Sequence, residues 1–120
     1  MVSRVLAVTV DCRDAERCAA FWCAALGTEV EERWRDAHGV EYVQIGTGEG
    51  APLLFQPVPE GRSGKNRLHL DLAPARGTQE VEVARLVELG ARCLSDPPEH
   101  PWVVLADPEG NEFCVLPPRE

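Results

Sequence analysis

The sequence predicts an α+β fold built from two tandem modules of the order strand, helix, strand, strand, strand. A length of 120 residues allows one compact domain, residues 1–120. Hydrophobic residues make up 44% and charged residues 27%, which is close to the globular average. The third observation is an internal repeat with a period of about sixty residues. Its landmarks are Leu6, Val8 and Val10 against Leu68, Leu70 and Leu72, Leu26-Gly27 against Leu89-Gly90, and Leu53–Pro57 against Phe113–Pro117.

The first module covers about residues 1–57. Alternating apolar residues with a high β-branched content predict a first strand over Arg4–Val10. A helix follows, because Asp14 is a suitable N-cap, apolar residues recur at helical spacing, and Gly27 ends the pattern. Three further strands are expected over Thr28–Trp34, Val40–Ile45 and Pro52–Gln56.

The second module covers about residues 66–120 and follows a polar, turn-rich connection over residues 57–65. Its first strand, Arg67–Leu72, has leucines on one face and His69 and Asp71 on the other. A helix over Thr78–Leu89 ends before Gly90. The last three strands are expected over Arg92–Leu94, Pro101–Ala106 and Glu112–Leu116.

Charge and cysteine usage narrow the classes of partner and compartment. Twenty acidic residues against twelve basic ones give a net charge of −8, which disfavours binding to nucleic acid and to anionic membranes. No apolar run approaches the roughly 20 residues of a membrane-spanning helix. The N-terminus lacks a secretory pattern and the five cysteines form no C-x-x-C pair, so we expect reduced thiols in a cytoplasmic protein.

Two motifs resemble a known superfamily. Asp14–Trp22 with the following Leu26-Gly27, and Asp107–Phe113, resemble the first helix and last hairpin of the vicinal oxygen chelate proteins. These include glyoxalase I, extradiol dioxygenases and bleomycin-resistance proteins, and Arg67–Leu72 is most similar to their small glyoxalase-like domains. The resemblance implies a curled mixed sheet around a cup, commonly completed in a homodimer. Exposed sheet edges also favour a homodimer.

The resemblance also implies metal ligands at one position on each of the first, fourth, fifth and eighth strands. In this sequence the first-strand position is Ala7, and the fourth is Leu54, or Gln56 if the strand slips by two residues. The fifth is His69 and the eighth is Cys114. Two good ligands are too few for a stable divalent site, so we expect no bound metal and no cofactor.

The candidate ligand-binding residues are those expected to line the cup: His69, Asp71, Gln56, Trp102, Trp34, Tyr42 and Cys114. His69 is the candidate catalytic residue, because a neighbouring carboxylate can tune an imidazole for acid/base work. The alternative for His69 is a structural histidine that bonds to backbone in the cavity wall. For the three aromatic residues the alternative is core packing, and Cys114 as a nucleophile would need a base such as His69.

These residues support two functional hypotheses. The first is a protein that binds a small organic molecule in the cup without the usual divalent metal. The alternative is an enzyme of the lyase, isomerase or dioxygenase type, which uses His69 as acid/base or as a ligand of an unusual metal site with Cys114. A third possibility is an accessory module that acts only with a protein partner.

Overall fold

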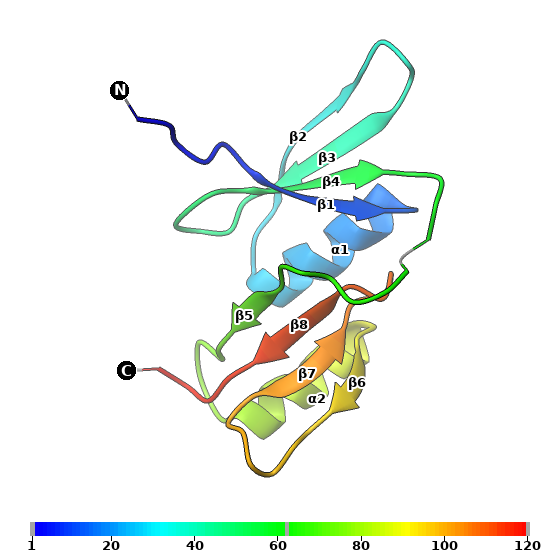
Figure 1. The fold of residues 1–120 in the computed structure, drawn as a ribbon. Coiled ribbons are helices and arrows are strands. Elements are labelled where there is room, and N and C mark those ends of the chain that lie inside the picture. Colours follow the sequence, from blue (N-terminus) through cyan, green and yellow to red (C-terminus); the bar gives the residue numbers. More distant parts are fainter. Residues whose placement is uncertain (1, 62, 120) are drawn as a thin grey trace. The chain divides into compact units, whose positions relative to one another are not determined.

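The computed structural model describes residues 2–61 and 63–119. This part of the chain contains two helices and two four-stranded sheets (Figure 1). It divides into two compact units, Met1–Gly61 and Arg62–Glu120. Each unit contains one helix and one mixed sheet, which confirms the α+β fold of two βαβββ modules.

The first unit has the sheet order β1-β4-β3-β2. β1 pairs in parallel with β4, whereas β3 pairs antiparallel with both β4 and β2. The helix α1 packs against β3 and β4, and Figure 1 shows it along one face of this sheet. The elements are β1 (Val8–Cys12), α1 (Ala15–Leu26), β2 (Val30–Arg35), β3 (Glu41–Ile45) and β4 (Leu53–Pro57).

The ends of α1 follow from the sequence. The side chain of Asp14 accepts a hydrogen bond from the backbone N–H of Arg17, which satisfies one of the free donors at the helix start. Gly27 ends the helix at φ 69°, a left-handed conformation that glycine adopts without steric cost. The face between these ends is buried and includes Cys18 and Trp22. As predicted, α1 is therefore an amphipathic helix whose apolar stripe lies in the core of the first unit.

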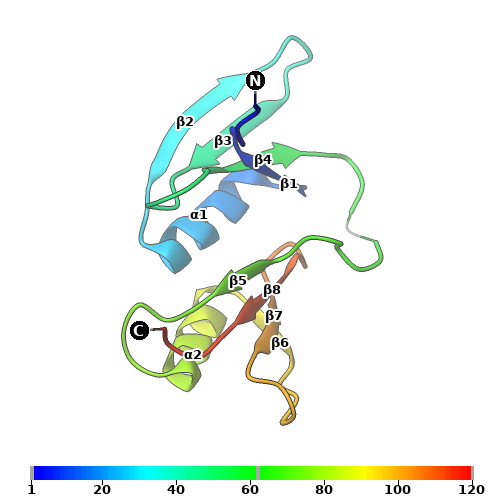
Figure 2. The same cartoon turned by 60° about the vertical axis from the view of Figure 1, so that its left-hand side comes forward.

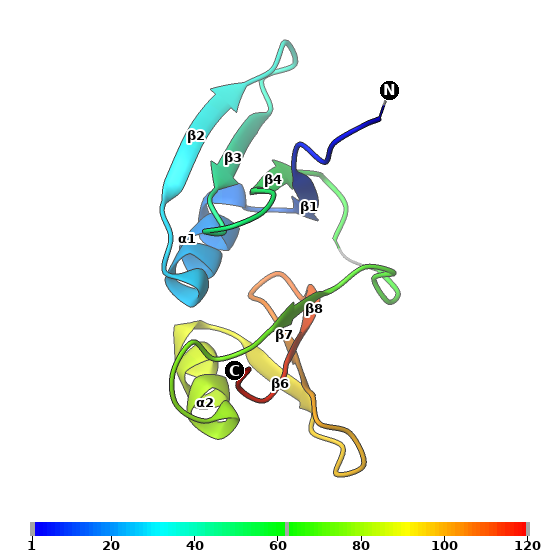
Figure 3. The ribbon, with the colours of Figure 1, turned by 90° about the vertical axis from the view of Figure 1, so that its left-hand side faces the viewer.

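The second unit repeats this topology, with the sheet order β5-β8-β7-β6 (Figure 2). β5 pairs in parallel with β8, and β7 pairs antiparallel with β8 and β6. Figure 3 shows the helix α2 along one face of this sheet, and Leu86 is its buried residue. The elements are β5 (Leu70–Leu72), α2 (Gln79–Leu89), β6 (Arg92–Ser95), β7 (Val103–Ala106) and β8 (Glu112–Val115).

The strand registers of the two units also agree. Thr9 faces Leu54 in the β1–β4 pair, and Asp71 faces Cys114 in the β5–β8 pair, which are the residues that the sequence repeat superposes. The alternate positions on the third and fourth strands of both units are buried, and they form the two cores: Val43, Ile45, Leu53 and Phe55, and Val103, Leu105, Phe113 and Val115. The internal repeat is thus a repeat of three-dimensional structure.

The first strand of each unit begins three or four residues later than the sequence pattern predicts. β1 begins at Val8 and β5 at Leu70, although apolar alternation starts earlier in both cases. The parallel ladders begin at Val8 opposite Leu53 and at Leu70 opposite Phe113, so the residues before them are not paired. Consequently Leu68 is 83% exposed, whereas the alternation placed it on the helix-facing side. Alternation predicts which face a residue takes but not how far the neighbouring strand extends.

No helix within residues 2–61 and 63–119 is long and apolar enough to span a membrane.

Candidate functional site in the second unit

The candidate site begins with a directly paired couple of residues on β5 and β8. Asp71 is the register partner of Cys114, and the pairs Leu70–Phe113 and Leu72–Val115 flank it. Because side chains alternate between the two faces of a sheet, Asp71 and Cys114 share one face. Their flanking residues on β8, which are buried, point to the opposite face. The core of the second unit therefore fixes the orientation of both polar side chains.

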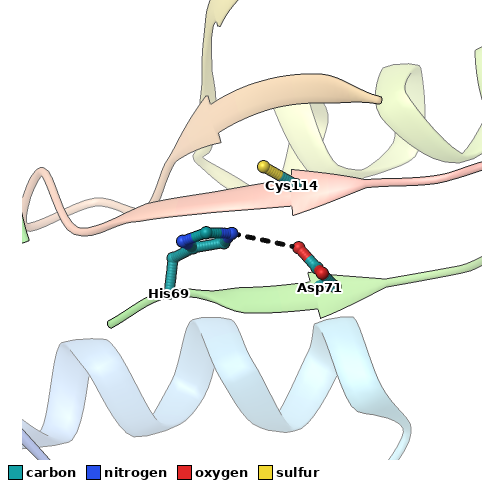
Figure 4. Close-up of side chains that lie close together, drawn as sticks. All are labelled: His69, Asp71 and Cys114. Carbon is teal, nitrogen blue, oxygen red and sulfur yellow. Dashed lines mark ion pairs between the residues drawn. The ribbon is translucent and has the colours of Figure 1, made fainter. Parts of the chain in front are cut away.

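His69 completes the cluster from the segment just before β5. It lies two residues before Asp71, and the two side chains are bonded at 3.3 Å between His69 Nε2 and Asp71 Oδ1. Figure 4 shows the imidazole and the carboxylate projecting from the same segment, beside the thiol on β8. One nitrogen, oxygen or sulfur atom from each of the three residues lies within 4.8 Å of the others. We call these residues the His69–Asp71–Cys114 cluster.

The cluster is accessible to small molecules. The side chain of His69 is 46% exposed and that of Asp71 is 60% exposed, whereas Cys114 is partly buried. Burial raises the pKa of the Cys114 thiol above its ordinary value of 9.0, and the negative charge of Asp71 raises it further. The thiol therefore stays protonated near neutral pH. Since thiolate is the nucleophilic form, this opposes a role for Cys114 as the attacking group.

A polar network joins the segments that precede β5 and β8. The amide of Asn66 donates a hydrogen bond of 3.0 Å to the side-chain oxygen of Asn111, which joins the segment before β5 to the turn before β8. The buried carboxylate of Asp107 accepts bonds from the backbone N–H groups of Glu109 and Asn111, both at 2.9 Å. Gly110 has φ 90°, as expected for this turn. The Asp-Pro-Glu-Gly-Asn sequence thus has the structural role that its turn chemistry predicts.

The predicted aromatic residues form two stacked pairs, one in each unit. Trp34 and Tyr42 are register partners on β2 and β3, and their rings stack with centroids 5.5 Å apart. The Tyr42 hydroxyl also donates to Asp36 Oδ2 at 2.9 Å. In the second unit, Trp102 lies just before β7 and stacks on His100 with centroids 4.3 Å apart. Trp34 is exposed, and Tyr42 and Trp102 are partly buried, so none of these three rings lies in the fully buried core.

The seven predicted ligand-binding residues are divided between the units. Four of them belong to the second unit: His69, Asp71, Trp102 and Cys114. His69 pairs with Asp71, and Trp102 stacks on His100. Gln56, on β4, belongs to the first unit with Trp34 and Tyr42, and it faces Asp11 of β1. The assignment of all seven residues to a ligand remains a prediction.

Sequence reasoning did not identify the polar network or the partner of Trp102. The Asn66–Asn111 bond joins residues that are far apart in the sequence, and no local pattern signals it. His100 precedes Trp102 by two residues, and this spacing was the only available sign of the stacked pair. Alternation predicts Asp71 beside His69, but no sequence pattern indicates that Asp71 also faces Cys114.

The usual metal positions of the superfamily are only half occupied by donors in this chain. In the first unit, the residues equivalent to His69, Asp71 and Cys114 are Ala7, Thr9 and Leu54. The side chains of Ala7 and Leu54 are hydrocarbons, so they supply no metal ligand at the first- and fourth-strand positions. The residues present therefore do not fit a metal shell that draws ligands from four strands.

Comparison with solved structures shows the same fold. Similar structures are FosX, a fosfomycin resistance protein from Mesorhizobium loti (13% identity, TM-score 0.76, 97% of this chain and 92% of that chain), and the trypanothione-dependent glyoxalase I of Leishmania major (17%, 0.71, 96% and 86%). TnmS3, an antibiotic binding protein from Streptomyces sp. CB03234, is also similar (21%, 0.64, 98% and 98%).

The family is identified by comparing the sequence with protein-family models. No curated protein matches it significantly. The family model described as "Glyoxalase-like domain", however, matches residues 7–116, which include both βαβββ modules and the whole candidate site. The chain therefore belongs to the glyoxalase-like domain family, within the vicinal oxygen chelate superfamily.

Proposed function

We propose that this chain binds a small organic molecule and that the His69–Asp71–Cys114 cluster supplies the polar contacts. The observation that carries the proposal is the cluster itself. Three chemically different polar groups, two on the paired strands β5 and β8 and one just before β5, lie within 4.8 Å of one another. Small-molecule sites typically combine a few convergent polar groups with an apolar or aromatic wall.

The chemistry of the cluster suits a ligand with both donors and acceptors. The Asp71 carboxylate accepts hydrogen bonds, while the imidazole of His69 offers one donor and one acceptor in its neutral form. Trp102 provides aromatic surface in the same unit. We further propose that Gln56, Trp34 and Tyr42, which belong to the first unit, also take part in ligand binding.

Two further observations support binding without the usual divalent metal. By the strand registers, the first- and fourth-strand ligand positions that the resemblance implies hold Ala7 and Leu54, whose side chains have no donor atoms, and a slip of two residues would place the amide of Gln56 at the fourth. In addition, one structure with the same fold, TnmS3, is described as an antibiotic binding protein. A glyoxalase-like fold can thus serve for binding. At the positions of the cluster, His, Asp and Cys side chains occur only in the second unit of this chain.

The direct test is a ligand screen on the full chain, with a metabolite and antibiotic library and ligand-observed NMR. Compounds that bind are then titrated against the wild type, His69→Ala and the control His38→Ala, which removes an exposed histidine on the β2–β3 turn. We expect His69→Ala to weaken binding by about 0.5–1.5 kcal/mol, the net contribution of one hydrogen bond. His38→Ala should bind like the wild type. Equal affinities for the wild type and His69→Ala would contradict the proposal.

The enzyme alternative is favoured by one specific contact. Asp71 Oδ1 lies 3.3 Å from His69 Nε2, an arrangement in which a carboxylate can orient an imidazole. As a general acid or base, His69 would act on a substrate bound at the cluster. Mass spectrometry of each binding compound after incubation with the protein distinguishes the hypotheses, because only an enzyme forms product. In that case His69→Ala should reduce turnover by roughly 10²–10⁴.

Assembly and location complete the proposal. We propose a homodimer, which is supported by the strongly exposed apolar side chains of Val5, Leu6 and Leu68 beside the first strand of each unit. Light scattering should then give twice the chain mass of 13.2 kDa, and a dilution-independent monomer would contradict this. The five free cysteines support a cytoplasmic location, where thiols stay reduced.

A further inference from the structure

The three donor atoms of the His69–Asp71–Cys114 cluster are spaced almost as ligands of one ion. Zinc binds nitrogen, oxygen and sulfur at about 2.0–2.3 Å, so two tetrahedral ligands lie about 3.3–3.6 Å apart. His69 Nε2 and Asp71 Oδ1 are already 3.3 Å apart. Since all three donors lie within 4.8 Å, the remaining distances need only small side-chain rotations.

The donor types select a class of ion. Imidazole, carboxylate and thiolate are the three side-chain ligands that zinc uses. Hard ions such as Mg²⁺ and Ca²⁺ prefer shells made only of oxygen, and a sulfur ligand disfavours them. Three protein ligands also leave one tetrahedral position open, as in catalytic zinc sites.

The backbone holds two of these donors in place without an ion. Asp71 and Cys114 are register partners in a parallel ladder, and buried residues flank Cys114 on both sides along β8. The Asn66–Asn111 bond ties the segment that carries His69 to the β8 side of the sheet. Because the three residues lie in one compact unit, the arrangement does not depend on the other unit.

We propose that His69, Asp71 and Cys114 bind a borderline or soft divalent ion, preferably Zn²⁺, with the fourth position open to water or to a bound organic molecule. The ion displaces the thiol proton of Cys114, which is released to solvent, so that the sulfur binds as thiolate. This set differs from the four-strand shell of the superfamily, because Asp71 lies at none of its positions. The expectation of no metal counted only His69 and Cys114, and the structure adds the third ligand. The inference goes beyond the proposed ligand binding and does not depend on it, since metal alone is the probe.

The first experiment is a Co²⁺ titration of the metal-free full chain, without a histidine tag. Tetrahedral Co²⁺ with a thiolate ligand gives intense visible bands and a sulfur-to-metal charge-transfer band. We expect this spectrum to saturate at one ion per chain in the wild type. Cys114→Ser should remove the charge-transfer band, whereas the control Cys93→Ser, at an exposed thiol on β6, should retain it.

The second experiment measures Zn²⁺ affinity by competition with a chromophoric chelator. Loss of a direct ligand should exceed the 10–100-fold typical of losing a group that only supports a ligand. Asp71→Asn and His69→Ala should therefore weaken Zn²⁺ binding more than about hundredfold, while His38→Ala binds like the wild type. Asp71 is 60% exposed, so its variant keeps the fold, which circular dichroism checks.

Three results would overturn the inference. They are a wild type that shows no thiolate band, a Cys114→Ser variant that keeps it, and an Asp71→Asn variant with wild-type Zn²⁺ affinity. A failed ligand screen would leave these outcomes unchanged, and a failed metal titration would leave the ligand screen unchanged. The two proposals can therefore be judged separately.

Discussion

The two units of this chain have the same topology and the same strand register, yet they carry different chemistry on one face. In the first unit, Thr9 faces Leu54. At the equivalent place in the second unit, Asp71 faces Cys114, and His69 lies where the first unit has Ala7. Buried residues on the other face remain apolar in both units.

The difference shows how a repeated fold separates stability from function. The buried face must exclude water in each unit, so its positions accept only apolar side chains. The opposite face has no such requirement, and polar groups there cost little if they have partners or remain accessible to water. The second unit uses this freedom to assemble the His69–Asp71–Cys114 cluster, whereas the first unit does not.

The largest losses of stability are expected from changes in the two buried cores, where the units are alike. Phe55 and Phe113, on the fourth strand of each unit, are both buried, at 0% and 1% exposure. Phe55→Ala and Phe113→Ala should each lower the free energy of unfolding by about 3–5 kcal/mol, because each leaves a cavity. Urea denaturation measures both values. A cost below about 1 kcal/mol for either variant would show that the two cores are not equivalent.

A smaller loss of stability is expected from changing a residue at the start of α2 that has no counterpart in α1. Gln79 is the first residue of α2, and its amide donates to the carbonyl oxygens of Pro101 at 2.7 Å and Val115 at 2.8 Å. The first residue of α1 is Ala15, which has no such group. Gln79→Ala should therefore destabilise the protein by on the order of 1–2 kcal/mol. Thermal unfolding measures it against Glu88→Ala, an exposed change on the same helix, for which we expect less than about 0.5 kcal/mol.

The smallest effect concerns acid stability in the first unit. Asp36 accepts hydrogen bonds from the backbone N–H of Val40, from the Tyr42 hydroxyl and from the N–H of His38, and these bonds hold its pKa below the ordinary 3.8. A lowered pKa means that the stabilisation is complete above the unfolded value and is lost as pH falls through the folded value. Asp36→Asn should thus be less stable than the wild type at pH 7.

The same comparison at lower pH completes this prediction. The stability difference between wild type and Asp36→Asn should shrink as pH falls below about 4, because the carboxylate is protonated first in the unfolded state and, at still lower pH, in the folded state. Denaturation curves at several pH values measure it. A difference that stays constant with pH would mean that the charge of Asp36 has no part in the turn.

The sequence predicted most of the fold because its signals were local. Asp14 and Gly27 fix the ends of α1, and the alternation of buried residues identifies β3, β4, β7 and β8. The early starts predicted for β1 and β5 were wrong because strand length depends on the neighbouring strand. Leu68, for instance, continues the apolar alternation but has no strand beside it and is exposed.

The candidate site was predictable only in part. Alternation places His69 and Asp71 on one face, and their ion pair confirms that they are neighbours. Whether Cys114 joins them depends on the register between two strands that are distant in sequence. That register follows from core packing, which no local pattern encodes, so Asp71 was not counted among the metal ligands.

The central claim is that ligand chemistry lies in the second unit and is absent from the equivalent positions of the first. The most direct measurement is a backbone amide NMR titration of the labelled full chain with a compound from the ligand screen. We expect the largest shift changes at His69, Asp71 and Cys114, and none of comparable size at Ala7, Thr9 and Leu54. Changes centred on the first-unit positions, or equal in both units, would contradict the account.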